Sequence, residues 1–270
     1  MYERKLLGID MSETLAIASG KGGVGKTTIS VNLALTQARS SNCLLLDADM
    51  GMANAHILLG INPKTSVRDV IEGNLSLEDA IVKGPDNIQF LSGGSGITEL
   101  LSIDKKKKFN FIRSFDTLSK KVDHLFVDVS AGADAVALNM ISASDKILIV
   151  LVNEPTSFMD AFTLIKACNL ELHFKEFCVV TNMVNSEHQG KLVFQRFNDI
   201  VTKFYDVNLN HVGSLLNIKE IKDSVLKKQP IVLNKKSKSI ISLFNRLSIN
   251  INNASKNLHN GIKFFNNIEN

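Results

Sequence analysis

The stretch SGKGGVGKTT, residues 19–28, follows a short apolar run and precedes a helical pattern. Residues 20–27 fit the spacing G-x-x-x-x-G-K-[ST], which acquires its meaning from a strand before it and a helix after it. Glycines let backbone amides turn toward a polyphosphate, and the start of a helix adds the positive end of its dipole. The stretch therefore predicts a phosphate-binding loop; a glycine-rich turn before an ordinary helix is the alternative.

The loop predicts roles for its individual side chains. Lys26 is expected to reach the β and γ phosphates of ATP, and Thr27 to coordinate Mg²⁺ through its hydroxyl. A single lysine suffices for this task, so the motif leaves Lys21 without a role. The residues expected to bind nucleotide here are Gly20, Lys21, Gly22, Gly23, Val24, Gly25, Lys26, Thr27 and Thr28.

Acidic residues follow two other apolar runs. Asp128 closes HLFVDV, residues 124–129, and is expected to reach Mg²⁺ through the water shell of the ion. Asp47 and Asp49 follow CLLL, and Asp49 is placed to point at the γ phosphate and orient the attacking water. The alternative for both runs is a solvated acid at the end of a strand.

Short apolar segments alternate with longer helical patterns along the chain. Several of the segments are apolar without alternation, as in strands covered on both faces. This rhythm predicts an α/β fold, a doubly wound and mostly parallel sheet with helices on both faces and ligands at the carboxyl ends of the strands. The expected strands are residues 15–19, 43–48, 88–91, 124–129, 146–152, 177–182 and 211–216, and the expected helices include 26–39, 133–142, 157–168 and 189–204.

Length and composition indicate one large globular domain. The 270 residues are 44% hydrophobic and carry a net charge of +4, which is too small by itself to indicate nucleic acid as a partner. The three cysteines are widely spaced in apolar contexts, which suits reduced thiols in the cytoplasm. We expect a short extension over 1–13, an ATPase domain over 14–252 and a tail over 253–270, with no secretion signal and no membrane span.

The motifs KGGVGKTT, DADMGMANAHILLG and DVSAG together resemble those of the deviant Walker A ATPases of the MinD/ParA class. In that class the extra lysine, here Lys21, reaches across a dimer interface to the nucleotide of the other subunit. The resemblance implies an ATP-dependent homodimer that hydrolyses ATP to ADP and phosphate. Lys21, Lys26 and Asp49 would be its catalytic residues, because a cation supplied in trans neutralises charge developing on the transferred phosphoryl group.

Longer stretches resemble the FlhG/FleN branch of that class, which regulates flagellar number and placement. They are residues 47–96, NEPTSFMDAFTLIK and TNMVNSEHQGKLVFQRF. By this likeness Asp49 is the switch acid, Asp160 belongs to a segment that responds to nucleotide, and Asn182 contacts the adenine. The chain departs from the class at Val129, where a threonine is frequent, and at Leu216, where a proline is frequent. Residues 1–13 also lack the DQAxxLR-type segment through which many FlhG proteins stimulate the FlhF GTPase.

The C-terminal end carries two apolar patterns. The first is typical of a last packed helix, with Ile240, Ile241, Leu243, Phe244 and Leu247 at helical spacing. The second places Leu258, Ile262, Phe265 and Ile268 on one helical face near Lys256 and Lys263. Such a helix can lie in a membrane interface, as in MinD and many FlhG proteins, and would attach the protein peripherally to the inner face of the cytoplasmic membrane. The alternatives are a frayed end and a helix packed on the body.

Three functions remain open from the sequence. The first is a flagellar switch whose partners would be an FlhF-type GTPase, a flagellar transcription regulator or a flagellar switch protein. The second is a ParA-like partition ATPase that binds DNA nonspecifically through a basic face. The third is an ATP-dependent ligase, for which the chain shows no obvious substrate domain. The lysines that could form the basic face are Lys219, Lys222, Lys227, Lys228, Lys235, Lys236 and Lys238.

Overall fold

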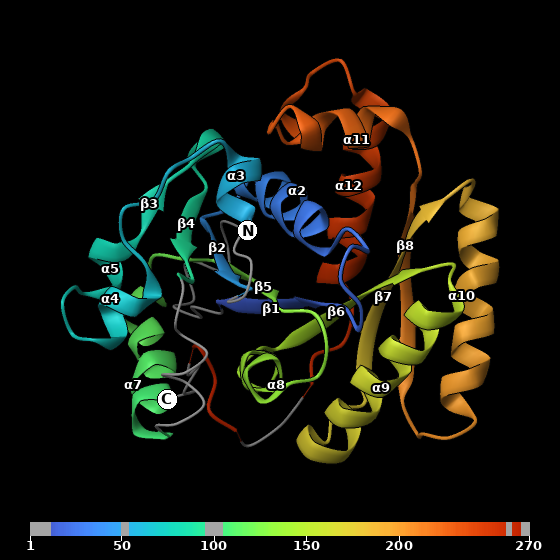
Figure 1. Ribbon diagram of the computed structural model, residues 1–270, viewed down its shortest axis with the longest axis horizontal. Coiled ribbons are helices and arrows are strands. Elements are labelled where there is room, and N and C mark those ends of the chain that lie inside the picture. Colours follow the sequence, from blue (N-terminus) through green and yellow to red (C-terminus); the bar gives the residue numbers. More distant parts are fainter. Residues whose placement is uncertain (1–11, 50–53, 95–104, 258–260, 266–270) are drawn as a thin grey trace.

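The protein folds around a single twisted sheet with helices on both faces (Figure 1). The computed structural model describes residues 12–49, 54–94, 105–257 and 261–265. Over these ranges the sheet has eight strands in the order β3-β4-β2-β5-β1-β6-β7-β8, and β1 lies between β5 and β6. The strands are β1 (Glu13–Ala18), β2 (Cys43–Ala48), β3 (Val82–Lys83), β4 (Gln89–Ser92), β5 (His124–Val129), β6 (Lys146–Val152), β7 (Glu176–Val184) and β8 (Asn208–Leu216).

The predicted doubly wound, mostly parallel sheet is confirmed. All neighbouring strands pair in parallel except the two-residue edge strand β3, which is antiparallel to β4. The central strands β2 and β6 are buried at every position, because helices cover both of their faces. The parallel register brings the ends of β2 and β5 level, so that Asp47 and Asp128 are direct neighbours.

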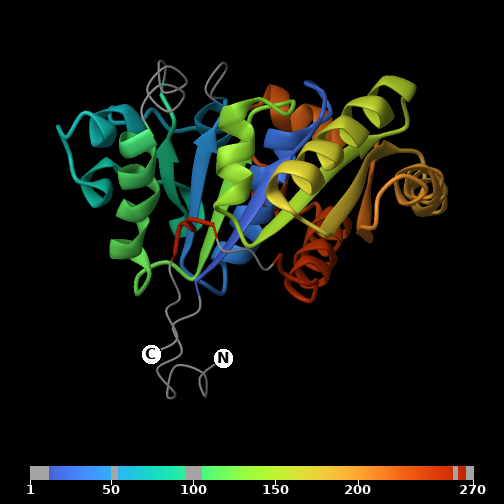
Figure 2. The same cartoon turned by 90° about the horizontal axis from the view of Figure 1, so that it is seen from below.

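Two helical layers enclose the sheet (Figures 1 and 2). Helices α7 to α10 pack on one face, and α2, α3 and α12 pack on the other. The predicted last packed helix is α12, with Ile240, Phe244 and Leu247 in the core. The helices are α2 (Lys26–Ala38), α3 (Ala55–Leu59), α4 (Val67–Ile71), α5 (Leu77–Ala80), α7 (Lys105–Ser114), α8 (Ala135–Ser142), α9 (Pro155–Leu172), α10 (Glu187–Thr202), α11 (Lys219–Leu226) and α12 (Lys238–Asn252), with short 3-10 turns η1 (Pro85–Asn87), η2 (Phe115–Leu118) and η3 (Ile231–Leu233).

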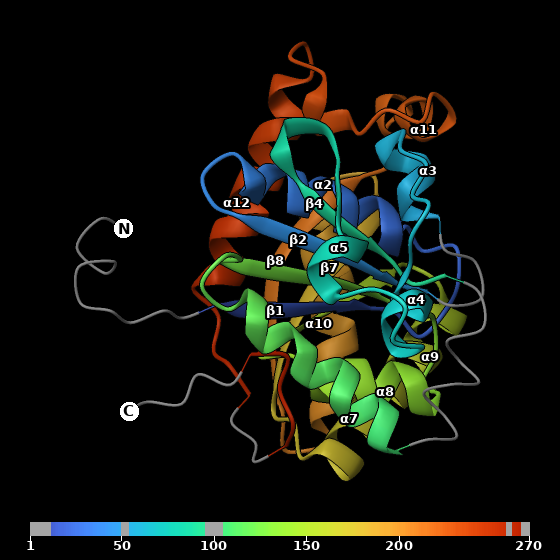
Figure 3. The same ribbon diagram turned by 90° about the vertical axis from the view of Figure 1, so that its left-hand side faces the viewer.

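The C-terminal tail differs from the expected amphipathic helix. Residues 254–257 and 261–265 are not helical, and Phe264 and Phe265 are both buried in the core beneath the sheet. The ring of Phe264 meets that of Phe115 edge to face, with centroids 4.8 Å apart, and its backbone N–H donates to the Ala143 carbonyl. Figure 3 shows this red segment beside α7. Leu258 and Ile268, two members of the expected apolar face, lie outside the described residues.

Polar contacts fasten the same segment to the edge of the sheet where the strands begin. The Asn257 side chain accepts from the backbone N–H groups of Lys175 and Glu176, and Lys263 Nζ lies 3.1 Å from Asp145 Oδ1. Lys256 Nζ lies 3.4 Å from a carboxylate oxygen of Glu13. The described parts of the tail therefore pack as a non-helical strap rather than as a free helix.

Within the described ranges, no helix is both long enough and apolar enough to cross a membrane. The three cysteines are free and buried, as expected. Burial raises the pKa of each of their thiols to about 12, which keeps the thiols protonated and unreactive.

Candidate nucleotide-binding site

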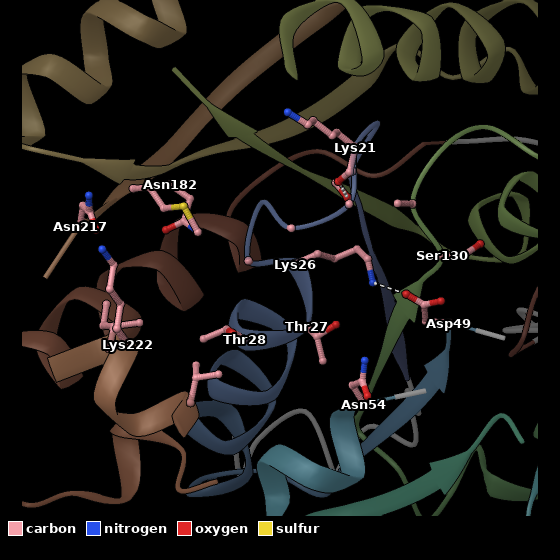
Figure 4. A pocket seen from close by; sticks show the side chains of 18 of the residues that line it. Lys21, Lys26, Thr27, Thr28, Asp49, Asn54, Ser130, Asn182, Asn217 and Lys222 are labelled. Carbon is pink, nitrogen blue, oxygen red and sulfur yellow. Dashed lines mark hydrogen bonds and ion pairs between the residues drawn. The ribbon is translucent and has the colours of Figure 1, made fainter. Parts of the chain in front are cut away.

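A cavity of about 900 Å³ opens at the carboxyl ends of the strands, above the end of β1 (Figure 4). This is the edge where a doubly wound sheet binds its ligands. The predicted loop forms one wall of it. The lining residues from the predicted set are Lys21, Gly22, Gly23, Gly25, Lys26, Thr27, Thr28, Asp49 and Asn182.

The conformation of Gly25 and the side chain of Asn182 hold the shape of the loop. Gly25 caps the start of α2 at φ 88°, a left-handed conformation that favours glycine. A Cβ at Gly25 would lie 2.4 Å from Asn182 Nδ2, and that same amide donates to the Val24 carbonyl at 2.8 Å. Asn182, predicted to contact the adenine, thus lines the cavity and also fixes the loop.

Lys26 lies buried beneath the loop between two carboxylates. Its Nζ donates to Asp128 Oδ1 at 2.8 Å and lies 3.7 Å from Asp49 Oδ2. Ser30 Oγ also donates to Asp128 Oδ1, at 2.8 Å. The structure therefore brings together Lys26, Asp49 and Asp128 from three elements that the sequence separates widely.

Asp128 is fully buried, yet its Oδ2 has no hydrogen-bond partner among the described residues. A buried carboxylate oxygen of this kind calls for a water or an ion. Mg²⁺ takes oxygen ligands and commonly keeps several of its waters. The unpartnered Asp128 Oδ2 and the hydroxyl of Thr27, a residue that lines the cavity, fit that chemistry.

Asp47 is buried beside Asp128 and turns toward the backbone. Its carboxylate accepts from the N–H groups of Ala55, at 3.0 Å, and Asp49, at 3.2 Å. Burial first, and the negative charge of Asp128 second, raise the pKa of Asp47 to about 7. The carboxylate of Asp47 thus anchors the segment after β2, whereas Asp49 faces the cavity.

Lys21 borders the cavity but directs its ammonium away from Lys26 (Figure 4). Its Nζ lies 2.8 Å from Glu154 Oε2 and 3.1 Å from Thr156 Oγ1, both at the start of α9. The side chains of Lys21 and Glu154 are 39% and 57% exposed, so solvent can compete for this pair. The ion pair therefore holds the Lys21 ammonium toward the start of α9 and away from Lys26.

Three other predicted positions lie around the loop. The backbone of Asp160, on α9, packs directly against Gly20, where a Cβ would lie 2.1 Å from the Asp160 carbonyl carbon. This contact brings α9 directly against the loop. Leu216 lines the cavity, and Val129 lies buried in the core instead of facing it.

Comparison with known proteins identifies the family. The family model described as an AAA domain matches residues 12–174. The chain is 35% identical over 220 residues to antiactivator FleN of Pseudomonas aeruginosa, covering 81% of this chain and 79% of FleN. The chain belongs to the MinD/ParA family of P-loop ATPases. As a member, it binds and hydrolyses ATP.

Two further relatives support the assignment to the MinD/ParA family. The flagellum site-determining protein YlxH of Helicobacter pylori is 27% identical over 205 residues, which cover 75% of this chain and 69% of YlxH. The solved MinC:MinD complex of Aquifex aeolicus contains a chain that is 27% identical, with a TM-score of 0.71 and coverage of 87% of this chain and 95% of that one. The predicted resemblance to MinD/ParA and FlhG/FleN proteins is confirmed.

Part of this MinD/ParA-type cavity was not predicted from the sequence. Ser130 and Asp134 follow β5, so the rule that ligands bind at strand ends could have found them. Asn217 follows β8 in the same way. Lys222, considered above as part of a basic surface, instead belongs with the cavity wall formed by α11, which had no motif to mark it. The unpredicted lining includes Asn54, Ser130, Asp134, Asn217, Ile218, Ile221, Lys222, Val225 and Leu226.

Proposed function

We propose that this ATPase is a dimeric switch that controls flagellar number or placement. FleN and YlxH, two of the relatives, carry names that refer to an antiactivator and to flagellum site determination. The relative in the MinC:MinD complex acts with a second protein. These names describe regulation and positioning. A switch that contacts a partner protein in only one nucleotide state can perform such roles with ATP as its only substrate.

The position of Lys21 carries the dimer proposal. Lys26 already places a buried cation under the loop, while Lys21 borders the cavity with its ammonium turned toward Glu154 and Thr156. A half-exposed ion pair is a weak restraint and can exchange for another anion. In the proposed dimer Lys21 leaves Glu154 for the phosphates of the partner subunit's nucleotide, where it stabilises the transition state.

The remaining site residues take matching roles in this proposal. Lys26 neutralises the β and γ phosphates, and Asp49 orients the attacking water. Thr27 and the unpartnered oxygen of Asp128 would hold Mg²⁺, and the ion would screen charge between the phosphates. Asn182 borders the base while it keeps the loop in place.

Light scattering on a sizing column tests the dimer. With Mg²⁺ and ATP the mass should double relative to the ADP sample. Lys21→Ala should stay monomeric while it still binds ATP, whereas Lys26→Ala should lose both properties. Lys191→Ala, an exposed lysine on α10, is the matched control and should behave as wild type. A wild-type protein that remains monomeric with ATP would contradict the proposal.

The flagellar role is tested in cells. Expression of this chain in Pseudomonas aeruginosa lacking FleN should restore the normal number of flagella, counted by electron microscopy. Lys26→Ala should fail to do so at equal protein level. Because FleN is named an antiactivator, we propose an activator protein as the partner; an FlhF-type GTPase or a flagellar switch protein would be found instead if pull-downs with ATP retain those.

The structure favours the flagellar switch over DNA partition. The seven lysines of the expected basic face are exposed, but Glu220 and Asp223 interrupt them and Lys222 lines the ATP cavity. The hypothesis of membrane attachment through a C-terminal amphipathic helix also loses support, because Phe265 is part of the core. Pelleting with DNA and with anionic liposomes, each with ATP, should retain little protein at physiological salt.

A further inference from the structure

Ser30 lies on α2 one turn after Lys26 and is fully buried. It does not line the nucleotide cavity, and the phosphate-binding motif does not include it. Its Oγ lies 3.0 Å from the Lys26 carbonyl oxygen and 2.8 Å from Asp128 Oδ1. A hydroxyl carries one proton. Ser30 therefore has two acceptors within reach and can satisfy only one of them fully at a time.

Two donors hold the same oxygen of the Asp128 carboxylate. Within the described part of the chain these donors are Lys26 Nζ and Ser30 Oγ, and each lies 2.8 Å from Oδ1. Asp128 Oδ2 has no donor among the same residues. The terminal torsion of an aspartate is broad and roughly two-fold, so the donors decide which way each oxygen faces. Together they hold Oδ1 against α2 and leave Oδ2 for an ion.

The two donors differ in their freedom to move. Lys26 lines the cavity, and its ammonium is at the end of a long flexible side chain. In the proposed nucleotide complex this ammonium turns to the phosphates and gives up its bond to Asp128. The Ser30 hydroxyl is one bond from Cβ on a buried helix, so it stays beside Asp128 and can only rotate its proton.

Departure of the lysine would leave Asp128 in an unfavourable setting. Its neighbour in the sheet is Asp47, a second fully buried carboxylate. A buried charge without a donor is costly, and a hydrogen bond to a charged acceptor is stronger than one to a neutral carbonyl. Once Lys26 has turned away, the Ser30 proton is therefore stabilised more by Asp128 than by the Lys26 carbonyl.

We propose that Ser30 is a positioning residue that orients Asp128 toward Mg²⁺ while nucleotide is bound. In the empty site Lys26 holds Oδ1, and the Ser30 proton is shared with the Lys26 carbonyl, a common acceptor for a serine inside a helix. When Lys26 engages the phosphates, the hydroxyl rotates to Oδ1 and Oδ2 keeps its direction. The inference rests on the proposed function, with the phosphates at the loop and Mg²⁺ at Asp128. Ser30 then matters in the nucleotide complex and little in the empty protein.

Mn²⁺ reports metal binding without turnover, because it takes the same oxygen ligands as Mg²⁺ and is paramagnetic. Electron paramagnetic resonance of free Mn²⁺, titrated with the full chain in excess over ADP, gives the metal affinity of the complex. Ser30→Ala should weaken this affinity about tenfold, the lower end of what groups that orient a metal ligand contribute. Two other quantities should change little: the ADP affinity in EDTA, measured by calorimetry, and the urea midpoint of the nucleotide-free protein, in which Lys26 still holds Asp128.

Thr36→Val is the matched control. Thr36 is a buried residue of the same helix, its Oγ1 donates to the Asn32 carbonyl at 2.7 Å, and it does not line the cavity. Valine removes the hydroxyl and keeps the size of the side chain. This variant should bind Mn²⁺ and ADP as wild type does.

Unchanged Mn²⁺ affinity in Ser30→Ala would overturn the inference, because Asp128 would then keep its orientation without the hydroxyl. Equal weakening of Mn²⁺ and of ADP in EDTA, or a large fall in the urea midpoint, would show that Ser30 is merely structural. A wild-type ADP complex that binds no Mn²⁺ would refute the metal site of the proposed function, and a wild type that binds no ADP would refute the nucleotide site. Both of these results are distinct from a failure of Ser30 alone.

Discussion

Asp49 and Lys26 both line the cavity, but Lys26 is held more firmly than Asp49. Lys26 is buried and bonded to Asp128, whereas Asp49 is a quarter exposed and lies 3.7 Å from the lysine. Its carboxylate is therefore free to turn toward a water, while the backbone N–H of Asp49 is tied to Asp47. This combination of a fixed backbone and a free carboxylate suits a residue that positions a nucleophile.

Replacement of Asp49 by alanine should reduce turnover without reducing ATP affinity. A group that orients water acts mainly on the hydrolytic transition state, so kcat should fall by roughly a hundredfold or more. Phosphate release and ATP binding measured on the same preparation check this, with the fully exposed Asp206→Asn as control. If Asp49→Ala hydrolyses ATP at the normal rate, another group orients the water.

The loop residues could be predicted from the sequence, and so could the acids beside Lys26, whereas the partner of Lys21 could not. The spacing of Gly20, Lys26 and Thr27 is local and reflects the geometry of a strand, a turn and a helix. Glu154, which holds Lys21, precedes the first residue of α9, and only the packed sheet brings it near. The partner of a long side chain depends on which residues the tertiary fold brings close to it, and a local sequence pattern does not contain this information.

Among the elements, three of the inner strands were predicted with their exact bounds, whereas the bounds of β1 and of the strands nearer the edges were shifted. The runs 43–48, 124–129 and 146–152 match β2, β5 and β6 without change, because burial on both faces makes each run apolar. At the edges this signal fades. β8 begins three residues earlier than expected, in the polar stretch NLN, and the two-residue β3 has no periodicity to detect.

The contact between the phosphate-binding loop and α9 gives a prediction at the level of elements. A Cβ at Gly20 would lie 2.1 to 2.5 Å from the backbone of Asp160 and Ala161. Because these are backbone atoms of a helix, no side-chain rotation can relieve the clash. Gly20→Ala should therefore push the loop and α9 apart. We expect a loss of about 1–3 kcal/mol in the free energy of unfolding, together with weaker ATP binding.

Gly22→Ala is the control for this change, because a Cβ at Gly22 would have nothing within 4 Å. Urea unfolding of the two variants, without nucleotide, compares them on the same loop. Equal stability of Gly20→Ala and Gly22→Ala would mean that α9 and the loop separate at no cost. In that case the segment around Asp160 could not respond to nucleotide through direct contact.

At the scale of the whole molecule, the tail shows the limit of a hydrophobic pattern. Spacing placed Phe265 on one face of a helix, yet the structure buries the adjacent Phe264 and Phe265 together in a non-helical segment. A helix lying on a surface buries one face, whereas this segment is not helical and buries two adjacent side chains. What selects it is the complementary surface, the ring of Phe115 and the free Ala143 carbonyl, which exist only after the sheet and its helices assemble.

Truncation of Phe264 to alanine should destabilise the entire domain. The side chain is fully buried, and a Phe→Ala change in a core typically costs about 3–5 kcal/mol through lost transfer energy and the cavity left behind. Ile262→Ala, two residues earlier and 37% exposed, should cost less than 1 kcal/mol. Urea unfolding of both variants measures the difference. ADP affinity of the folded Phe264→Ala protein should stay normal, since the tail lies at the edge of the sheet opposite the loop. Equal, small losses in both variants would show that the strap contributes nothing to the core, and the tail would then be free to form the amphipathic helix that its spacing predicts.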